Sequence, residues 1–104
     1  MIVEVRTMRV KPGKRAEFLE IFHTRSMPAQ AAVGIKMLRP FLSVEDPDVF
    51  VFIRGFPDLA ARDTMKEQFY EGPVWKGELE ALLLPLLERW EVAVIDDPEG
   101  QIAW

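Results

Sequence analysis

At 104 residues the chain has the size of one domain with a single core, and we expect one domain over residues 1–104, in which residues 96–104 form a C-terminal tail. Apolar residues make up 49% and charged residues 29%, which excludes a disordered or fibrous protein. Cysteine is absent, which excludes disulfides and sulfur-ligated metals and favours a cytoplasmic location. The longest apolar run, residues 81–87, is far too short for a membrane span, and we expect neither a signal peptide nor a membrane partner.

The net charge of −4 is unevenly distributed, because basic residues are concentrated in residues 1–40 and acidic ones in residues 41–104. A basic segment can indicate nucleic-acid binding. Here the basic residues do not alternate with aromatic ones, as a single-strand binding surface requires, and sheet pairing would mix the two halves. Nucleic acid is therefore not an expected partner.

The first third of the chain predicts a strand followed by a bent helical arm. Alternating side chains indicate a strand over residues 2–10, which ends at the turn-forming residues 11–13. Apolar positions then repeat at helical spacing as far as Ser26. Pro28 would interrupt a continuous helix, so a second helical piece should begin there and end at Gly34.

The rest of the chain predicts a hairpin, a second helical arm and a last strand. A short polar turn joins strands expected over residues 35–44 and 48–56. Asp58 is a suitable N-cap for the next helix, and Pro85 should end the second arm before a strand over residues 89–95. The segment 101–104 could dock on a partner or fray.

This order of elements predicts an α+β, ferredoxin-like βαββαβ sandwich, with a four-stranded antiparallel sheet and both helical arms on one face. Residues 49–53 are apolar at every position, so both faces of their strand need a cover. Because the helices can cover only one face, we expect the other to pack against a second copy of the chain, in a homodimer formed through the sheet.

Several segments resemble the NIPSNAP-type domain of the dimeric α+β barrel superfamily. They are Glu4–Thr7, Lys11–Lys14, Ala16–Leu19, Pro73–Trp75 and Leu84–Leu87. The resemblance covers roughly residues 1–96 and implies a ferredoxin-like protomer that dimerises into a barrel, with a small cavity between sheet and helices. It implies no particular reaction, since the wider superfamily includes cofactor-independent monooxygenases, haem-degrading enzymes and lactone isomerases.

His23 is the only histidine, so any histidine-based acid, base or axial ligand must be this residue. It could face a cavity as a catalytic group, or it could be a boundary residue that bonds to the backbone. A metal site is not expected, because a second histidine and all cysteines are missing. No phosphate loop or serine elbow is present, and we expect no cofactor.

Glu4 and Arg6 point to the same side of one strand, and Arg54 lies on the neighbouring strand in line with the phenylalanines. One interpretation is a buried ion pair of Glu4 with Arg6 or Arg54. The other is that these residues line the cavity, where arginines stabilise an acidic or enolate-like oxygen and Arg54 acts in catalysis. Arg39 is a weaker candidate for the same role.

Three aromatic residues, Phe22, Tyr70 and Trp75, fall on or beside the apolar helical stripes, where packing is the default explanation. A small planar ligand would need such walls. We therefore expect a homodimeric protein that binds a small apolar or aromatic molecule between sheet and helices. The alternative is a cofactor-independent monooxygenase or isomerase for an aromatic or polyketide-like substrate, and the sequence leaves open whether the protein is an enzyme.

Overall fold

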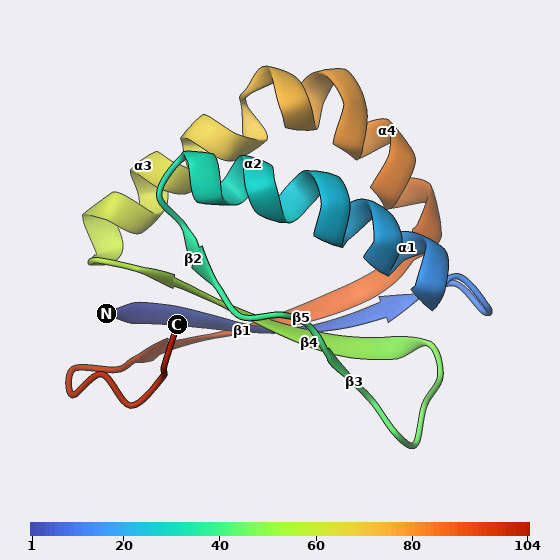
Figure 1. Cartoon of the computed structure of the whole chain (residues 1–104), viewed down its shortest axis with the longest axis horizontal. Coiled ribbons are helices and arrows are strands. Elements are labelled where there is room, and N and C mark those ends of the chain that lie inside the picture. The colour runs from blue at the N-terminus through green and yellow to red at the C-terminus, as the bar shows by residue number, and fades with distance from the viewer.

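The computed structural model describes residues 1–104 and shows one sheet with two helical arms on the same face (Figure 1). The first arm consists of α1 (Arg15–Ile21), a π-helical turn η1 (Phe22–Ser26) and α2 (Met27–Ala32). The second consists of α3 (Leu59–Tyr70), a π-helical turn η2 (Trp75–Leu79), α4 (Glu80–Leu83) and a 3-10 turn η3 (Leu84–Leu86). The strands are β1 (Ile2–Val10), β2 (Lys36–Met37), β3 (Phe41–Leu42), β4 (Val49–Phe56) and β5 (Leu87–Asp96).

The strands form one antiparallel sheet in the order β2-β4-β1-β5, and β3 also pairs with β4. In the register of the central strands, Glu4 of β1 lies opposite Arg54 of β4 and Val94 of β5. First and last strands are thus neighbours and the hairpin strand lies on the other side of β1, as the ferredoxin-like order requires. The predicted fold class is confirmed.

The strand expected over residues 35–44 forms two short strands instead of one. Leu38 still donates to the carbonyl of Ile53, at 3.1 Å, but pairing lapses at Arg39 and Pro40 before β3 resumes it. Proline has no N–H to donate to a sheet, which explains the interruption. The sheet therefore has five strands where four were expected.

The first helical arm bends where the sequence predicts it. Pro28 lies in the first turn of α2, and Gly34 follows the helix with φ of 93°, a conformation that favours glycine. The π-helical turn before Pro28 was not predicted. A proline ring clashes with the carbonyl one turn earlier in a regular α-helix, and the wider turn relieves that clash.

The second arm begins at the expected cap, where the Asp58 carboxylate accepts from the N–H of Ala61 at 2.7 Å. Its end differs slightly from the prediction: Pro85 lies inside the 3-10 turn and β5 begins at Leu87, two residues early. A proline fits the first turn of a helical segment because its missing N–H has no partner there.

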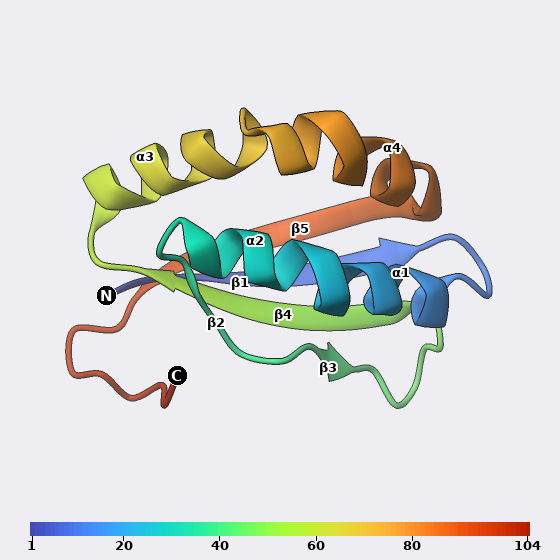
Figure 2. The ribbon, with the colours of Figure 1, turned by 45° about the horizontal axis from the view of Figure 1, so that its top comes forward.

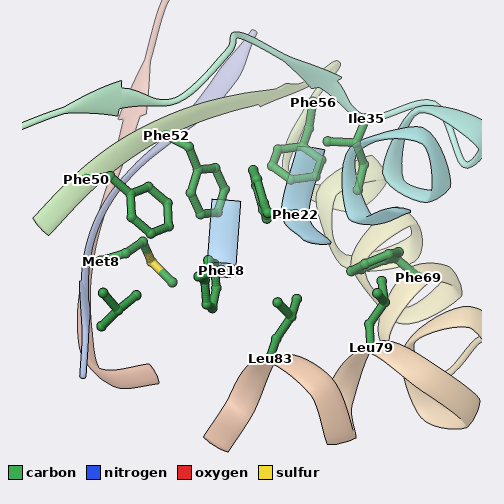
Figure 3. Packing of buried hydrophobic residues seen from close by; sticks show 11 residues of the cluster. Met8, Phe18, Phe22, Ile35, Phe50, Phe52, Phe56, Phe69, Leu79 and Leu83 are labelled. Carbon is green, nitrogen blue, oxygen red and sulfur yellow. The ribbon is translucent and has the colours of Figure 1, made fainter. Parts of the chain in front are cut away.

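Phenylalanines from the sheet and the first arm form the centre of the core. Phe18 packs on Phe50 with ring centroids 5.3 Å apart, and Phe22 packs on Phe52 at 4.9 Å. Figure 3 shows these rings meeting between strand and helix, with Leu83 of the second arm closing the layer. The alternating side chains of β4 thus supply one half of the core.

The face of the sheet away from the helices is apolar over one half and lacks a helical cover. By strand alternation it carries Val5, Val51, Ile53 and Ile95, with Phe41 at its edge. The edge strand β5 is exposed from Glu88 to Asp96, including its helix-side residues Trp90, Val92 and Val94. The helical arms therefore cover the sheet incompletely.

Residues 97–104 fold back beneath the sheet, on the side opposite the helices (Figure 2). The buried carboxylate of Asp97 accepts from the N–H groups of Gln101 and Ile102, at 2.9 and 3.1 Å. These bonds lower the pKa of Asp97. The ring of Trp104 then lies against Gly55 on the sheet, so the tail packs on its own chain.

Candidate functional site

A cavity of about 210 Å³ lies between the sheet and the two helical arms. Eleven of its fifteen lining residues are hydrophobic. The aromatic ones are Phe18, Phe22, Phe52, Phe69, Tyr70, Trp75 and Trp90. Two lining residues, Leu84 and Trp90, are 43% and 50% exposed, which indicates that the cavity meets solvent between them.

The second arm contributes a cluster of three aromatic rings to the cavity. Tyr70 and Trp75 meet edge to face with centroids 5.0 Å apart, and Phe69 lies 4.8 Å from Tyr70. The indole N–H of Trp75 donates to the Glu80 carboxylate at 3.0 Å, which fixes the ring from behind. This wall is held in place by packing and by a hydrogen bond, not by the presence of a ligand.

Behind the polar side of the cavity, the carboxylate of Glu4 is fully buried among four cationic side chains. Its Oε1 accepts from Arg54 Nε at 2.7 Å and from Arg6 Nη1 at 3.0 Å. Its Oε2 accepts from Arg62 Nε at 2.7 Å and from Lys66 Nζ at 2.9 Å. The expected ion pairs of Glu4 with Arg6 and with Arg54 are both present.

Burial by itself would raise the pKa of Glu4. The charge of Arg54 and the hydrogen bonds from Lys66, Arg54 and Arg62 outweigh burial and hold that pKa far below its ordinary value. Glu4 is therefore a permanent carboxylate and has no proton to exchange with a ligand near neutral pH.

A second layer of hydrogen bonds orients Arg54, which is itself fully buried. Its Nη1 donates to Gln30 Oε1 at 2.7 Å, and Gln30 Nε2 donates to Ser26 Oγ at 3.1 Å. Ser26 and Gln30 both line the cavity, so the network links the sheet to the first helical arm at the cavity wall. Side chains held by several buried hydrogen bonds keep a single orientation.

Two donors of this network have no partner. They are Arg6 Nε and Arg54 Nη2, both buried. Buried N–H groups in folded proteins are nearly always hydrogen-bonded, to protein, water or ligand. Arg6 is one of the lining residues, so its guanidinium group forms part of the cavity wall.

The structure brings together six of the eight residues that the sequence singled out. Arg6, Phe22, Tyr70 and Trp75 line the cavity, and Glu4 and Arg54 support its polar wall. His23 and Arg39 lie elsewhere: His23 is exposed, with its Nε2 3.3 Å from Arg39 Nη2, and neither lines the cavity.

Sequence reasoning missed four polar residues of the site: Ser26, Gln30, Arg62 and Lys66. The last two are four residues apart on α3, so they share one helical face, and Lys66 also precedes Phe69 and Tyr70 on the apolar side. The sequence does contain one indication of a buried anionic partner: two cations at this spacing lie beside the apolar stripe of the helix.

The sheet topology and the one-sided helices define an α+β sandwich of ferredoxin-like type, with a small-molecule-sized cavity between sheet and helices that opens to solvent. The model of the NIPSNAP family matches residues 3–94, and the chain belongs to this family.

Solved structures support the same assignment of fold. An uncharacterized NIPSNAP domain protein from Burkholderia xenovorans is 22% identical, with a TM-score of 0.85 over 99% of this chain and 100% of the other. A NIPSNAP family protein from Agrobacterium tumefaciens is 23% identical, with a TM-score of 0.82 over 94% and 93%. An antibiotic biosynthesis monooxygenase is 21% identical, with a TM-score of 0.68 over 93% and 98%.

No curated protein matches the chain. None of its helices combines the length and the apolar character needed to cross a membrane. No group of three or more histidine, cysteine, aspartate or glutamate side chains has an arrangement that could hold a metal ion.

Proposed function

We propose that the protein binds a small apolar or aromatic molecule in the cavity between sheet and helices, and that it does so as a homodimer formed through the outer face of the sheet. The aromatic lining of the cavity is the observation that carries this proposal. Binding sites for small molecules are concave, mostly apolar, and carry a few placed polar groups. The cytoplasmic location expected from the sequence stays a prediction.

The volume limits the size of the ligand. An engineered protein cavity of about 150 Å³ holds one benzene molecule. The present cavity of about 210 Å³ therefore suits a substituted single ring or two small fused rings. Larger molecules would have to extend past Leu84 and Trp90 into solvent.

The dimer is supported by the apolar side chains that remain uncovered on the outer face and along β5. A monomeric protein rarely keeps such a patch in contact with water. Two of these faces packed about a twofold axis would bury on the order of 1,600 Å². Trp104 and the tail cover only the end of the sheet near Gly55.

Catalysis on an aromatic or polyketide-like substrate, without a cofactor, is the second candidate. It is favoured by the position of Arg6 and Lys66 on the wall of an apolar cavity, where cations stabilise an enolate oxygen. The likeness in fold to an antibiotic biosynthesis monooxygenase is compatible with it. Binding ranks ahead because neither the buried carboxylate nor the histidine offers a good general base: the pKa of Glu4 is held too low for it to take up a proton, and His23 lies outside the lining.

The test is a screen of one- and two-ring aromatic molecules by NMR of the three tryptophan indole N–H groups. Trp75 and Trp90 line the cavity, whereas Trp104 lies on the opposite face of the sheet. We expect ligands to shift the resonances of Trp75 and Trp90 and to leave that of Trp104 in place. Oxygen consumption or product formation with the same molecules would promote the enzymatic candidate.

A matched pair of variants controls for the site. Leu84→Trp should obstruct the opening and weaken binding, because Leu84 lines the cavity. Leu82→Trp makes the same change at a residue that is 41% exposed and outside the lining, and it should bind normally. Equal binding to both variants would show that the ligands occupy another place.

A further inference from the structure

We infer that the cavity selects a ligand with a carboxylate or an equally planar anionic oxygen group, which binds between Arg6 and Lys66 while its aromatic ring lies among the phenylalanines. This inference rests on the proposed binding function and adds the charge and the shape of the ligand's polar end. The charges, the unpartnered donors and the position of the rings each support it.

The polar wall carries an excess of positive charge. Glu4 is the single carboxylate of the network, and Arg6, Arg54, Arg62 and Lys66 all donate to it. One negative charge among four positive ones leaves an excess of three, of which Arg54 is fully buried and Arg6 nearly so, whereas Arg62 and Lys66 are partly exposed to solvent. Cations in such surroundings are costly unless an anion balances them, so an anionic ligand would bind more tightly than a neutral one of the same shape.

Arg6 has one side of its guanidinium free for that anion. Its bond to Glu4 uses Nη1, whereas Nε is buried without a partner. Nε and Nη2 form the other edge of the guanidinium group, whose two parallel N–H bonds match the two oxygens of a carboxylate. Arg6 is therefore bound to the protein through Nη1, and the edge formed by Nε and Nη2, with Nε lying below the cavity surface, is the one left for a planar ligand.

Lys66, on α3, also lines the cavity and bonds to the other oxygen of the Glu4 carboxylate than Arg6 does. One of its three N–H donors holds Glu4 Oε2, so the others are available to a ligand. A cation from a strand and a cation from a helix thus flank the same part of the cavity. This arrangement favours a single anionic group at one end of the ligand.

The rings around Arg6 determine where the apolar part of the ligand would lie. The guanidinium of Arg6 rests 5.6 Å from the centre of the Phe52 ring, which holds its plane. Beyond it the lining is apolar through Phe22, Phe69 and Trp75. An aromatic acid therefore matches the cavity along its whole length: the acid group at Arg6 and the ring in the apolar part.

The experiment compares acids with uncharged amides of the same shape: benzoate with benzamide, and 2-naphthoate with 2-naphthamide. Dissociation constants are measured by the tryptophan resonances or by calorimetry at pH 7. We expect the acid to bind at least about tenfold more tightly than its amide, the size of one charge-assisted hydrogen bond. In Arg6→Met the preference for the acid should fall several-fold, and Lys66 is the cation that accounts for what remains.

Arg6→Met should fold, because Glu4 keeps Arg54, Arg62 and Lys66 as partners. Lys66→Met is the second variant. It should also reduce the preference for the acid, because it removes the other cation that flanks the anionic group. Arg6→Lys retains the charge but not the paired donors, so it should keep only part of the preference. Lys11→Met removes an exposed charge in the turn after β1, away from the cavity, and should leave the preference unchanged.

The outcomes separate this inference from the proposed function. If acid and amide bind equally to the unaltered protein, the selection of an anion is wrong and the binding function stands. If neither member of either pair binds, the proposed function fails, and this inference fails with it. Inorganic phosphate is a further probe: if it competes with benzoate as strongly as benzoate itself does, the site recognises charge without the aromatic ring and the inference is overturned.

Discussion

Glu4 is the residue on which the polar wall of the cavity depends. Four cations from two strands and a helix converge on its two oxygens, and Arg54, which is equally buried, has no other anionic partner. Removing one member of a buried charge network leaves the others unpaired, and this is far more costly than the loss of a surface pair.

We predict that Glu4→Gln lowers the free energy of unfolding by about 3–5 kcal/mol, because buried Arg54 would lose its counter-charge. Chemical denaturation with urea measures the change. Glu17→Gln is the matched control. Glu17 forms an exposed ion pair with Lys14 Nζ at 3.7 Å, and loss of such a surface pair should change stability little. A loss at Glu4 no larger than that at Glu17 would contradict the prediction.

The same residue predicts a dependence of stability on pH. The pKa of Glu4 is depressed in the folded protein and 4.5 in its ordinary state, so at low pH the unfolded chain takes up a proton that the folded one does not. The stabilisation from Glu4 is therefore fully present above about pH 5 and is lost as the pH falls through 4.5 and below. Urea denaturation between pH 6 and pH 3 should show a steeper loss in the unaltered protein than in Glu4→Gln, and parallel curves would refute the assignment.

Gly55 has a different kind of constraint, set by space and not by charge. A Cβ atom there would overlap the ring of Trp104 and lie 3.1 Å from the Met1 side chain. We predict that Gly55→Ala displaces Trp104 from the sheet, which a red shift of its fluorescence in a Trp75→Phe, Trp90→Phe background would report. Gly77→Ala, where nothing lies within 4 Å of the added atom, should leave that emission unchanged.

At the scale of the elements, the sequence predicted the strands and the bends better than the helix geometry. Strands β1 and β4 were predictable because their side chains alternate or are apolar throughout, and the bend at Pro28 followed from the missing N–H. The two π-helical turns were not predictable, since Pro28 indicates an interruption but not the kind of turn that relieves it, and an extra residue in a helical turn leaves no periodic signal.

The start of α3 offers a prediction about one element. The Asp58 carboxylate accepts from the Ala61 N–H, so Asp58→Ala should destabilise the protein by about 1 kcal/mol. Thermal unfolding measures this loss. Asp63→Ala serves as the control: Asp63 is exposed within the same helix, and its replacement should have a smaller effect. A larger loss of stability in Asp63→Ala than in Asp58→Ala would count against a capping role for Asp58.

The site itself was only half visible in the sequence, and the reason is geometric. Glu4, Arg6 and Arg54 could be grouped because strand alternation fixes which side chains share a face. Arg62 and Lys66 could not, because no rule of spacing says where a helix lies over a sheet. His23 is prominent in the sequence because it is the only histidine, yet in the structure it is exposed beside Arg39.

At the scale of the whole molecule, the uncovered sheet face predicts association. Light scattering coupled to size exclusion should report about twice the chain mass of 12.0 kDa. Ile53→Glu introduces a charge into the middle of that face and should give a species near 12.0 kDa. Gln68→Glu, an exposed change on the helical side, should leave the dimer intact, and a monomeric unaltered protein would disprove the assembly.

The exposed edge strand β5 has a consequence for aggregation of the protein. It ends the strand order, so one row of its backbone amides and carbonyls faces solvent unpaired. The first half of β5 carries charges that disfavour pairing with another strand, at Glu88, Arg89 and Glu91. The second half, Val92 to Ile95, has high β-propensity and no charge. This stretch is where fibrils should nucleate, because packing of two outer faces leaves the β5 edge unpaired, and Val94→Lys is the substitution that would prevent it.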